Sequence, residues 1–222
     1  MVEDLHIPAG MAAPGQREPH PALERLAGEN GVCVAAELAD GRRIAANLAL
    51  VGIGGLANDE LAAAAGLETR NGIVVDQHGR TSVPGIYAAG DCALFPIAGT
   101  TMRVESVQNA IDQANHVADD ILGEARPYAP VPWFWSDQYD WKLQTAGLAV
   151  LPDAEIAVPG HREGALAVWY LKNGIAVAVD TINDGKTHMA ARRLFAAQAA
   201  ISAEQIAAPG FDPVVLMKSL AA

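Results

Sequence analysis

The sequence predicts an α/β region over residues 25–126 followed by an α+β region over residues 127–222. In the first region, apolar stretches end in glycine turns and precede an amphipathic helix over residues 105–122, an order that is typical of sheets covered by helices. In the second region, alternating apolar segments precede two helices, which is typical of an antiparallel sheet with one packed face. Three prolines within residues 126–132 mark the boundary between the two regions.

Composition restricts the classes of function. The chain has 222 residues, of which 51% are hydrophobic and 18% charged, so it can bury a core and is not globally disordered. A net charge of −11 disfavours nucleic acid and anionic membranes as partners. No apolar run is long enough for a membrane span, and the acidic N-terminus does not resemble a signal peptide. The isolated Cys33 and Cys92 fit a reducing compartment, so we expect a cytoplasmic protein.

The first region divides into short elements. Residues 1–24 carry frequent prolines and glycines without a period, so we expect an irregular segment. Residues 31–38 predict a strand, and Asp40-Gly41 predicts a hairpin turn after it. Residues 48–54 are apolar on both faces, which predicts a fully buried strand.

Further elements follow up to the linker. Residues 59–65 predict a short helix that ends at Gly66, and residues 72–76 predict a short strand. A third strand over residues 86–89 is expected to end at Gly90-Asp91. Apolar residues recur at helical spacing through residues 105–122, and Gly123 follows in the position typical of a helix end.

The second region opens with an aromatic cluster, in which residues 133–141 hold five of the twelve aromatic side chains. After this cluster, the alternating pattern predicts strands, and Lys172-Asn173-Gly174 predicts a hairpin turn between two of them. The expected strands span residues 154–158, 165–171 and 175–180, and the expected helices span residues 187–200 and a last stretch near Lys218.

A glycine-rich stretch over residues 52–57 matches the dinucleotide-binding pattern G-x-G-x-x-G/A. One interpretation is a phosphate-binding turn at a helix N-terminus. The other is a buried strand that ends in a flexible turn. The second is favoured because the helix that follows is short and ends at Gly66.

A more specific signal lies between Thr81 and Cys92, where an apolar strand delivers Gly90 and then Asp91. Open α/β sheets bind ligands at the carboxyl ends of their strands, and a carboxylate there can accept hydrogen bonds from polyol hydroxyls. The segment resembles the second FAD-binding motif of the pyridine-nucleotide-dependent flavoprotein reductases. A turn after a strand is the structural alternative.

Four more segments narrow the resemblance to the ferredoxin and rubredoxin reductases that serve oxygenases and cytochromes P450. Together the similarity covers about residues 25–222, and the run Trp-Phe-Trp-Ser-Asp-Gln is its most specific part. The four segments are residues 103–110, 132–138, 143–148 and 189–194.

The resemblance implies roles for individual residues. Asp91, after Gly90, would bind the ribityl hydroxyls of FAD. The helix that begins near Glu105 would point its N-terminus at the flavin, where its partial positive charge stabilises negative charge on the reduced ring. The residues that would line the ring or wall it near the surface are Glu105, Ser106, Val107, Trp133 and Trp135.

The resemblance also implies what the sequence lacks. Family members carry one glycine fingerprint for the ADP half of FAD and another for NADH, and neither is found here. Against the family, the sequence starts late in the NAD domain, and Gly52-Ile53-Gly54 corresponds to the crossing back into the FAD domain. We therefore expect a truncated FAD/NAD(P)-binding reductase fold over residues 25–126, and the reductase C-terminal domain over residues 127–222.

Two functions follow from this comparison. The first is a flavoprotein oxidoreductase that passes electrons from NAD(P)H through FAD to a ferredoxin or rubredoxin. It would work with a separately encoded N-terminal half, as a homodimer, or as part of a longer polypeptide of which this sequence is a piece. The second is a non-catalytic interaction or dimerisation module derived from such a reductase. Arg192 and Arg193 are interpreted either as a solvated helix face or as a basic spot for an acidic ferredoxin. The six histidines are scattered without ligand spacing, so no metal site is expected.

Overall fold

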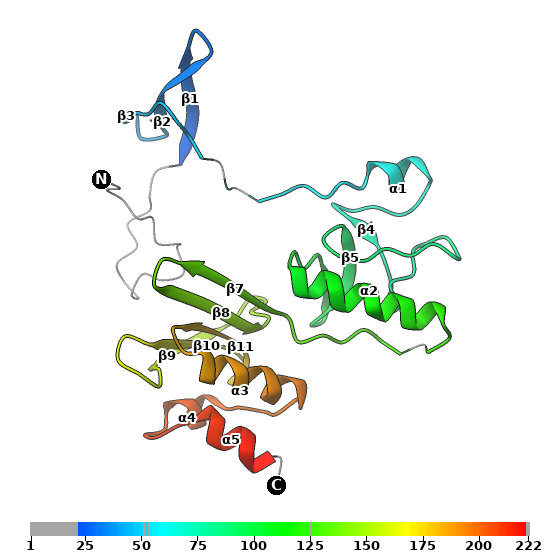
Figure 1. Cartoon of the computed structure of the whole chain (residues 1–222), viewed down its shortest axis with the longest axis vertical. Helices are drawn as coiled ribbons and strands as arrows, with labels where there is room; N and C mark the ends of the chain where they lie inside the picture. The colour runs from blue at the N-terminus through cyan, green and yellow to red at the C-terminus, as the bar shows by residue number, and fades with distance from the viewer. Residues whose placement is uncertain (1–21, 51, 53, 125, 221–222) are drawn as a thin grey trace. The chain divides into compact units, whose positions relative to one another are not determined.

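The computed structural model describes residues 22–50, 52, 54–124 and 126–220. It divides into two compact units, Met1–Gly55 and Leu56–Ala222, which are described one at a time (Figure 1). None of the helices within the described ranges is both long and apolar enough to cross a membrane.

The first unit contains a three-stranded antiparallel sheet. Its strands are β1 (Leu23–Glu29), β2 (Val32–Leu38) and β3 (Arg43–Ala45), in that order across the sheet. The predicted strand over residues 31–38 and the turn after it are confirmed, and Gly41 supplies the positive φ of +86° that this turn requires. Strand β1 was not predicted.

The buried strand expected over residues 48–54 is wrong. The described residues of this range form no strand, while Leu48 and Leu50 are 86% and 99% exposed. Val51 and Ile53 lie outside the described residues, and with them part of the glycine-rich stretch. An apolar strand of this type needs paired neighbours and covered faces, but the described sheet of this unit contains only β1 to β3.

The second unit begins with helix α1 (Glu60–Ala64) and a small sheet of order β4-β5-β6. Strand β4 (Ile73–Val74) pairs in parallel with β5 (Ala93–Ile97), and β5 pairs antiparallel with β6 (Thr100–Met102). The predicted short helix over residues 59–65 and the short strand over residues 72–76 are confirmed.

The strand predicted over residues 86–89 is wrong, because only Tyr87 is in β geometry, through a single bridge to Arg80. The strand in this part of the chain is instead β5, which begins two residues after Asp91. An apolar segment forms a ladder only where a neighbouring strand is available. Among the described residues, the backbone of residues 86–89 pairs only with residues 79–81, which form a turn and not a strand.

Helix α2 (Val107–Ile121) confirms the helix predicted from periodicity. Ser106 is its N-cap, and the side-chain oxygen of Ser106 accepts a hydrogen bond from the backbone N–H of Asn109 at 3.2 Å. Phe95 of β5 lies in a small core with Val75 and Ala93. Helix α2 contacts the turns around this small sheet, through Gln113 to Gly90 and His116 to Gln77.

The C-terminal part of this unit is a five-stranded antiparallel sheet, and the three predicted strands and their hairpin turn are confirmed. In that turn Asn173 and Gly174 have φ of +52° and +76°, the conformation of a two-residue hairpin loop. The order across the sheet is β7 (Trp133–Gln138), β8 (Trp141–Gly147), β11 (Ile175–Ile182), β10 (Leu166–Lys172) and β9 (Ala154–Pro159).

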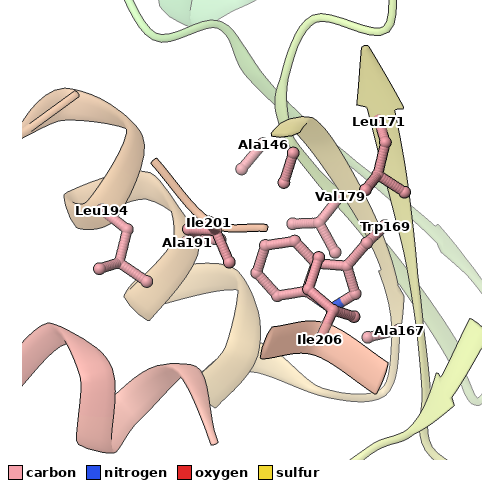
Figure 2. Packing of buried hydrophobic residues seen from close by; sticks show 10 residues of the cluster. Ala146, Ala167, Trp169, Leu171, Val179, Ala191, Leu194, Ile201 and Ile206 are labelled. Atoms are coloured by element: carbon pink, nitrogen blue, oxygen red, sulfur yellow. The ribbon is translucent and has the colours of Figure 1, made fainter. Parts of the chain in front are cut away.

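Three helices follow or flank this sheet: α3 (Gly185–Ala196), α4 (Ala203–Ala207) and α5 (Pro213–Leu220). Helix α3 packs on β8 and β11, and α5 packs on α3 (Figure 1). The two predicted helices are confirmed, with α3 shifted toward the N-terminus, and α4 was not predicted. Figure 2 shows the core between sheet and helices, in which Trp169 is surrounded by aliphatic side chains.

Candidate functional site

The turn at Gly90-Asp91 is fixed by helix α2. Gly90 is buried with φ of +82°, and its backbone N–H donates a hydrogen bond to Oε1 of Gln113 at 2.7 Å. A Cβ at Gly90 would lie 3.4 Å from Cβ of Ala110, which is ordinary van der Waals contact. It is therefore the positive φ that favours glycine at this position.

Arg103 joins the turn to the start of α2. Its Nη1 donates to the carbonyl oxygen of Asp91 at 2.9 Å and also forms an ion pair with the Glu105 carboxylate. Its aliphatic stem packs on Gly72, where an added Cβ would lie 2.6 Å from the Arg103 Cδ. The Asp91 side chain is exposed, and its carboxylate has no hydrogen-bond or ion-pair partner among the described residues. It is therefore free to accept hydrogen bonds from a ligand.

The N-terminus of α2 offers donors next to this turn. The backbone N–H groups of Val107 and Gln108 have no acceptor among the described residues, as expected for the first turn of a helix. The aligned peptide dipoles add partial positive charge there. The Val107 side chain is 64% exposed, while Ser106 is half-buried because of its capping role. This end of the helix can bind a negatively charged or polarised oxygen.

The two predicted tryptophans lie on β7 as a stacked pair, with ring centroids 5.5 Å apart. The Arg192 guanidinium carbon lies 3.9 Å from the Trp133 ring centroid, and His188 contacts the same ring at 5.8 Å. Trp133 is half-buried under these contacts, whereas Trp135 is 42% exposed. Trp135 is thus the ring of this pair with more surface open to a ligand or partner.

Burial affects the charges beside Trp133. Desolvation lowers the pKa of Arg192, although Asp112 opposes the shift. Desolvation also lowers the pKa of His188, and the positive charge of Arg192 lowers it further. His188 is therefore neutral at pH 7, and Arg192 is the cation of this cluster.

A groove of about 1030 Å³ lies beside the cluster. Trp133, Arg192 and Arg193 line it, together with Asp112 of α2 and Tyr128 of the linker. Nη1 of Arg193 is 3.8 Å from Sδ of Met217, and Arg193 is otherwise exposed. The interpretation of these arginines as a basic spot stays a prediction.

The predicted site residues fall into two groups. Gly90, Asp91, Glu105 and Ser106 are held together at the start of α2. Among the described residues, no hydrogen bond, ion pair or ring contact joins that group to the tryptophans on β7. Sequence reasoning missed the two residues that hold the first group together, Gln113 and Arg103. Arg103 begins one of the family-like segments, whereas no local pattern marks Gln113.

Family models match most of the chain. Residues 19–114 match the pyridine nucleotide-disulphide oxidoreductase model, and residues 133–221 match the reductase C-terminal model. Rhodocoxin reductase of Rhodococcus erythropolis is 42% identical over 171 residues, which is 76% of this chain and 40% of that protein. A ferredoxin–NAD(P)(+) reductase of Sphingomonas sp. is 42% identical over 180 residues, 79% of this chain and 44% of that protein.

Solved structures agree with these matches. The ferredoxin reductase for the CYP199A2 system of Rhodopseudomonas palustris superposes with a TM-score of 0.83 at 40% identity, over 91% of this chain and 50% of that chain. The reductase in the covalent putidaredoxin reductase–putidaredoxin complex gives a TM-score of 0.81 at 32% identity, over 90% and 49%. The chain therefore spans half or less of the length of these relatives. It belongs to the ferredoxin reductases of the pyridine nucleotide-disulphide oxidoreductase family and carries their reductase C-terminal domain.

Proposed function

We propose that this chain is the flavin-ring-binding portion of a reductase that passes electrons from NAD(P)H through FAD to a ferredoxin or rubredoxin. The observation that carries the proposal is the free Asp91 carboxylate beside the open N-terminus of α2. Family membership supplies the chemical class, because the relatives are named as ferredoxin reductases.

The residues present fit one half of FAD. Asp91 offers an unpaired carboxylate for ribityl hydroxyls, and the N–H groups of Val107 and Gln108 are unpaired donors for a ring oxygen. Such donors fit the negative charge that develops on a reduced flavin ring. For the ADP half, the described residues supply no strand and helix joined by a glycine fingerprint, so this half has no counterpart among them.

FAD, when bound, supplies the chemistry that takes two electrons from NAD(P)H and releases them one at a time. The residues of this chain would bind the cofactor and orient its ring. The ion pair between Arg103 and Glu105 neutralises the carboxylate nearest the helix start. The N-terminus of α2 therefore keeps its positive character where the ring would lie. Gln113 and Arg103 hold the Asp91 turn at a fixed distance from that helix end.

A redox partner is proposed on the same basis. One structural relative was solved as a covalent complex of putidaredoxin reductase with putidaredoxin. By analogy, the exposed Trp135 and Arg192, which contacts the adjoining Trp133, are candidates for the surface that meets an acidic iron–sulfur protein. The flavin-facing roles of Trp133 and Trp135 remain proposals.

A titration of FAD with the full chain tests the flavin site, read by fluorescence anisotropy of the flavin. We expect weak binding, because the ADP half lacks its anchor, and each missing charge-assisted hydrogen bond is worth about 1.5–3 kcal/mol. Asp91→Ala should abolish that binding. The control Asp140→Ala removes another exposed carboxylate, from the β7–β8 turn, and should leave binding unchanged. Equal binding by both variants would contradict the assignment of Asp91.

The competing function is a non-catalytic interaction module. It predicts no flavin binding by the chain at any attainable concentration, and no bleaching of added FAD by NADH under anaerobic conditions. The apolar side of α2 that carries Val107, Ile111, Ile121 and Leu122 is exposed, which favours an interaction role for this chain in addition to flavin binding.

A further inference from the structure

Tyr128 fixes the middle of the linker that runs from α2 to β7. Its backbone N–H donates to the carbonyl oxygen of Gln77 at 2.7 Å, and its hydroxyl donates to Oδ1 of Asn109 at 3.1 Å. Its half-buried ring contacts Phe95 and His116, with ring centroids 5.5 Å and 5.1 Å away. Hydrogen bonds and ring packing therefore tie this part of the linker to α2 and the small sheet.

The end of the linker is tied to the five-stranded sheet instead. The carbonyl oxygen of Pro132 accepts a hydrogen bond from the Gly147 N–H at 2.9 Å, and β7 begins at the next residue, Trp133. Only residues 129–131 separate Tyr128 from Pro132, a span of at most about 14 Å. The strand that carries both tryptophans therefore starts within a short reach of Tyr128.

Asn109 connects the Tyr128 hydroxyl to the start of α2. Asn109 is only 5% exposed, and its Nδ2 donates to the carbonyl oxygen of Val104 at 3.0 Å while its backbone N–H donates to Oγ of Ser106. Because an amide oxygen only accepts, the Tyr128 hydroxyl is the donor in their hydrogen bond. Burial raises the pKa of this hydroxyl, and the charge of Asp112 raises it further, so the donor keeps its proton.

The linker is also the polar connection between the two groups of candidate site residues. Helix α2 approaches β7, but no hydrogen bond, ion pair or ring contact among the described residues joins α2 or its N-terminal turn to β7 or α3. Residues of both sides line the open groove of about 1030 Å³. The charge of Asp112 acts on Arg192 across this groove, yet these two side chains form no ion pair.

We propose that Tyr128 is a positioning residue, whose hydroxyl bond to Asn109 sets where Trp133 and Trp135 stand relative to the N-terminus of α2. The inference rests on the proposed function, which assigns both groups to one flavin site. Such a site requires its surfaces to be held within about 0.5 Å of the working geometry. The ring of Tyr128 packs against the small core, so the ring serves stability and the hydroxyl serves the site.

A distance measurement tests this without flavin. Spin labels are attached at two exposed positions, Asn115→Cys on α2 and Asp137→Cys on β7, in a chain whose two native cysteines are replaced by serine. Double electron–electron resonance then gives the distribution of the distance between the labels. Tyr128→Phe keeps the ring but cannot donate, so we expect it to shift or broaden this distribution. The control Tyr87→Phe removes another half-buried hydroxyl that donates to α2 at 3.1 Å, to Asp120, and should leave the distribution unchanged.

Flavin binding is the second readout, measured by titrating FAD with each full-length variant. We expect Tyr128→Phe to weaken binding by about 3- to 10-fold, the effect of one lost hydrogen bond. It should also reduce the quenching of flavin emission that contact with the tryptophans causes. Tyr87→Phe should change neither quantity. Urea unfolding should show similar small losses of stability in the two variants, which separates positioning from folding.

The outcomes distinguish the positioning role from the proposed function. An unchanged distance distribution in Tyr128→Phe, or the same change in Tyr87→Phe, would overturn the proposal. Equal FAD affinity and equal quenching in Tyr128→Phe and the wild type would also overturn it. A distribution that changes as expected, in a chain that binds no FAD at all, would refute the proposed function and leave Tyr128 as the residue that positions β7 against α2.

Discussion

Gln113 is predicted to hold the Gly90-Asp91 turn, and its replacement by leucine tests this directly. The side chain is 2% exposed, and its Oε1 accepts the only hydrogen bond that the buried Gly90 N–H makes with a described residue. Leucine has similar volume and helix propensity, but it cannot accept the hydrogen bond from this N–H. Because the leucine side chain also excludes water from the site, the N–H is left unpaired. An unsatisfied buried donor costs about 1–3 kcal/mol.

Urea unfolding measures the loss of stability, and amide exchange at Gly90 measures its cause. We expect Gln113→Leu to lower the free energy of unfolding by about 1–3 kcal/mol and to speed exchange at Gly90 more than elsewhere in the unit. Asn115→Leu, at an exposed position on the same helix, is the control and should change stability by no more than about 0.5 kcal/mol. Unchanged protection at Gly90 in the leucine variant would refute the positioning role of Gln113.

Three further predictions concern stability. Arg80 holds the pKa of Asp120 below its ordinary value through hydrogen bonds, so the stabilisation is present at neutral pH and is lost as the pH falls below about 4. Asp120→Asn should therefore be less stable than the wild type at pH 7. Unfolding measured at decreasing pH should show the two proteins becoming equally stable. Burial raises the pKa of Asp180, so its ionised carboxylate lowers the stability of the folded state at neutral pH, the opposite of Asp120. Asp180→Asn keeps an acceptor for the Tyr170 hydroxyl and should be more stable than the wild type at pH 7 but not below about pH 4. A loss of stability at pH 7 would contradict this. Trp169 is fully buried and its Nε1 has no hydrogen-bond partner among the described residues. Trp169→Ala should lower the free energy of unfolding in urea by about 3–5 kcal/mol, whereas Trp169→Phe removes the unpaired donor and should lower it much less. Equal losses in the two variants would show that the indole N–H has a partner.

Sequence patterns predicted strands and turns well where the segments that pair are close together in the sequence. The strands and hairpin turn of the C-terminal sheet follow from alternation and from Asn173-Gly174, because each strand pairs with a neighbour close in sequence. The two strands that were wrongly predicted, over residues 48–54 and 86–89, are apolar segments that have no neighbouring strand among the described residues. Strand propensity identifies such segments as suited to a sheet, but it does not show whether a partner strand is available.

In the candidate site, too, some residues could be found from local sequence patterns and others could not. Gly90 and Asp91 could be found because a glycine and an acid follow an apolar stretch, whereas Ser106 was proposed only through the resemblance to the reductase family. Its role as the N-cap of α2 comes from the structure. Gln113 could not be found, because an apolar stripe at helical spacing ordinarily marks the side of a helix that faces the interior, whereas the structure buries the polar side of α2. The contacts that reverse this expectation, to Gly90 and Arg80, lie 23 and 40 positions away in the sequence.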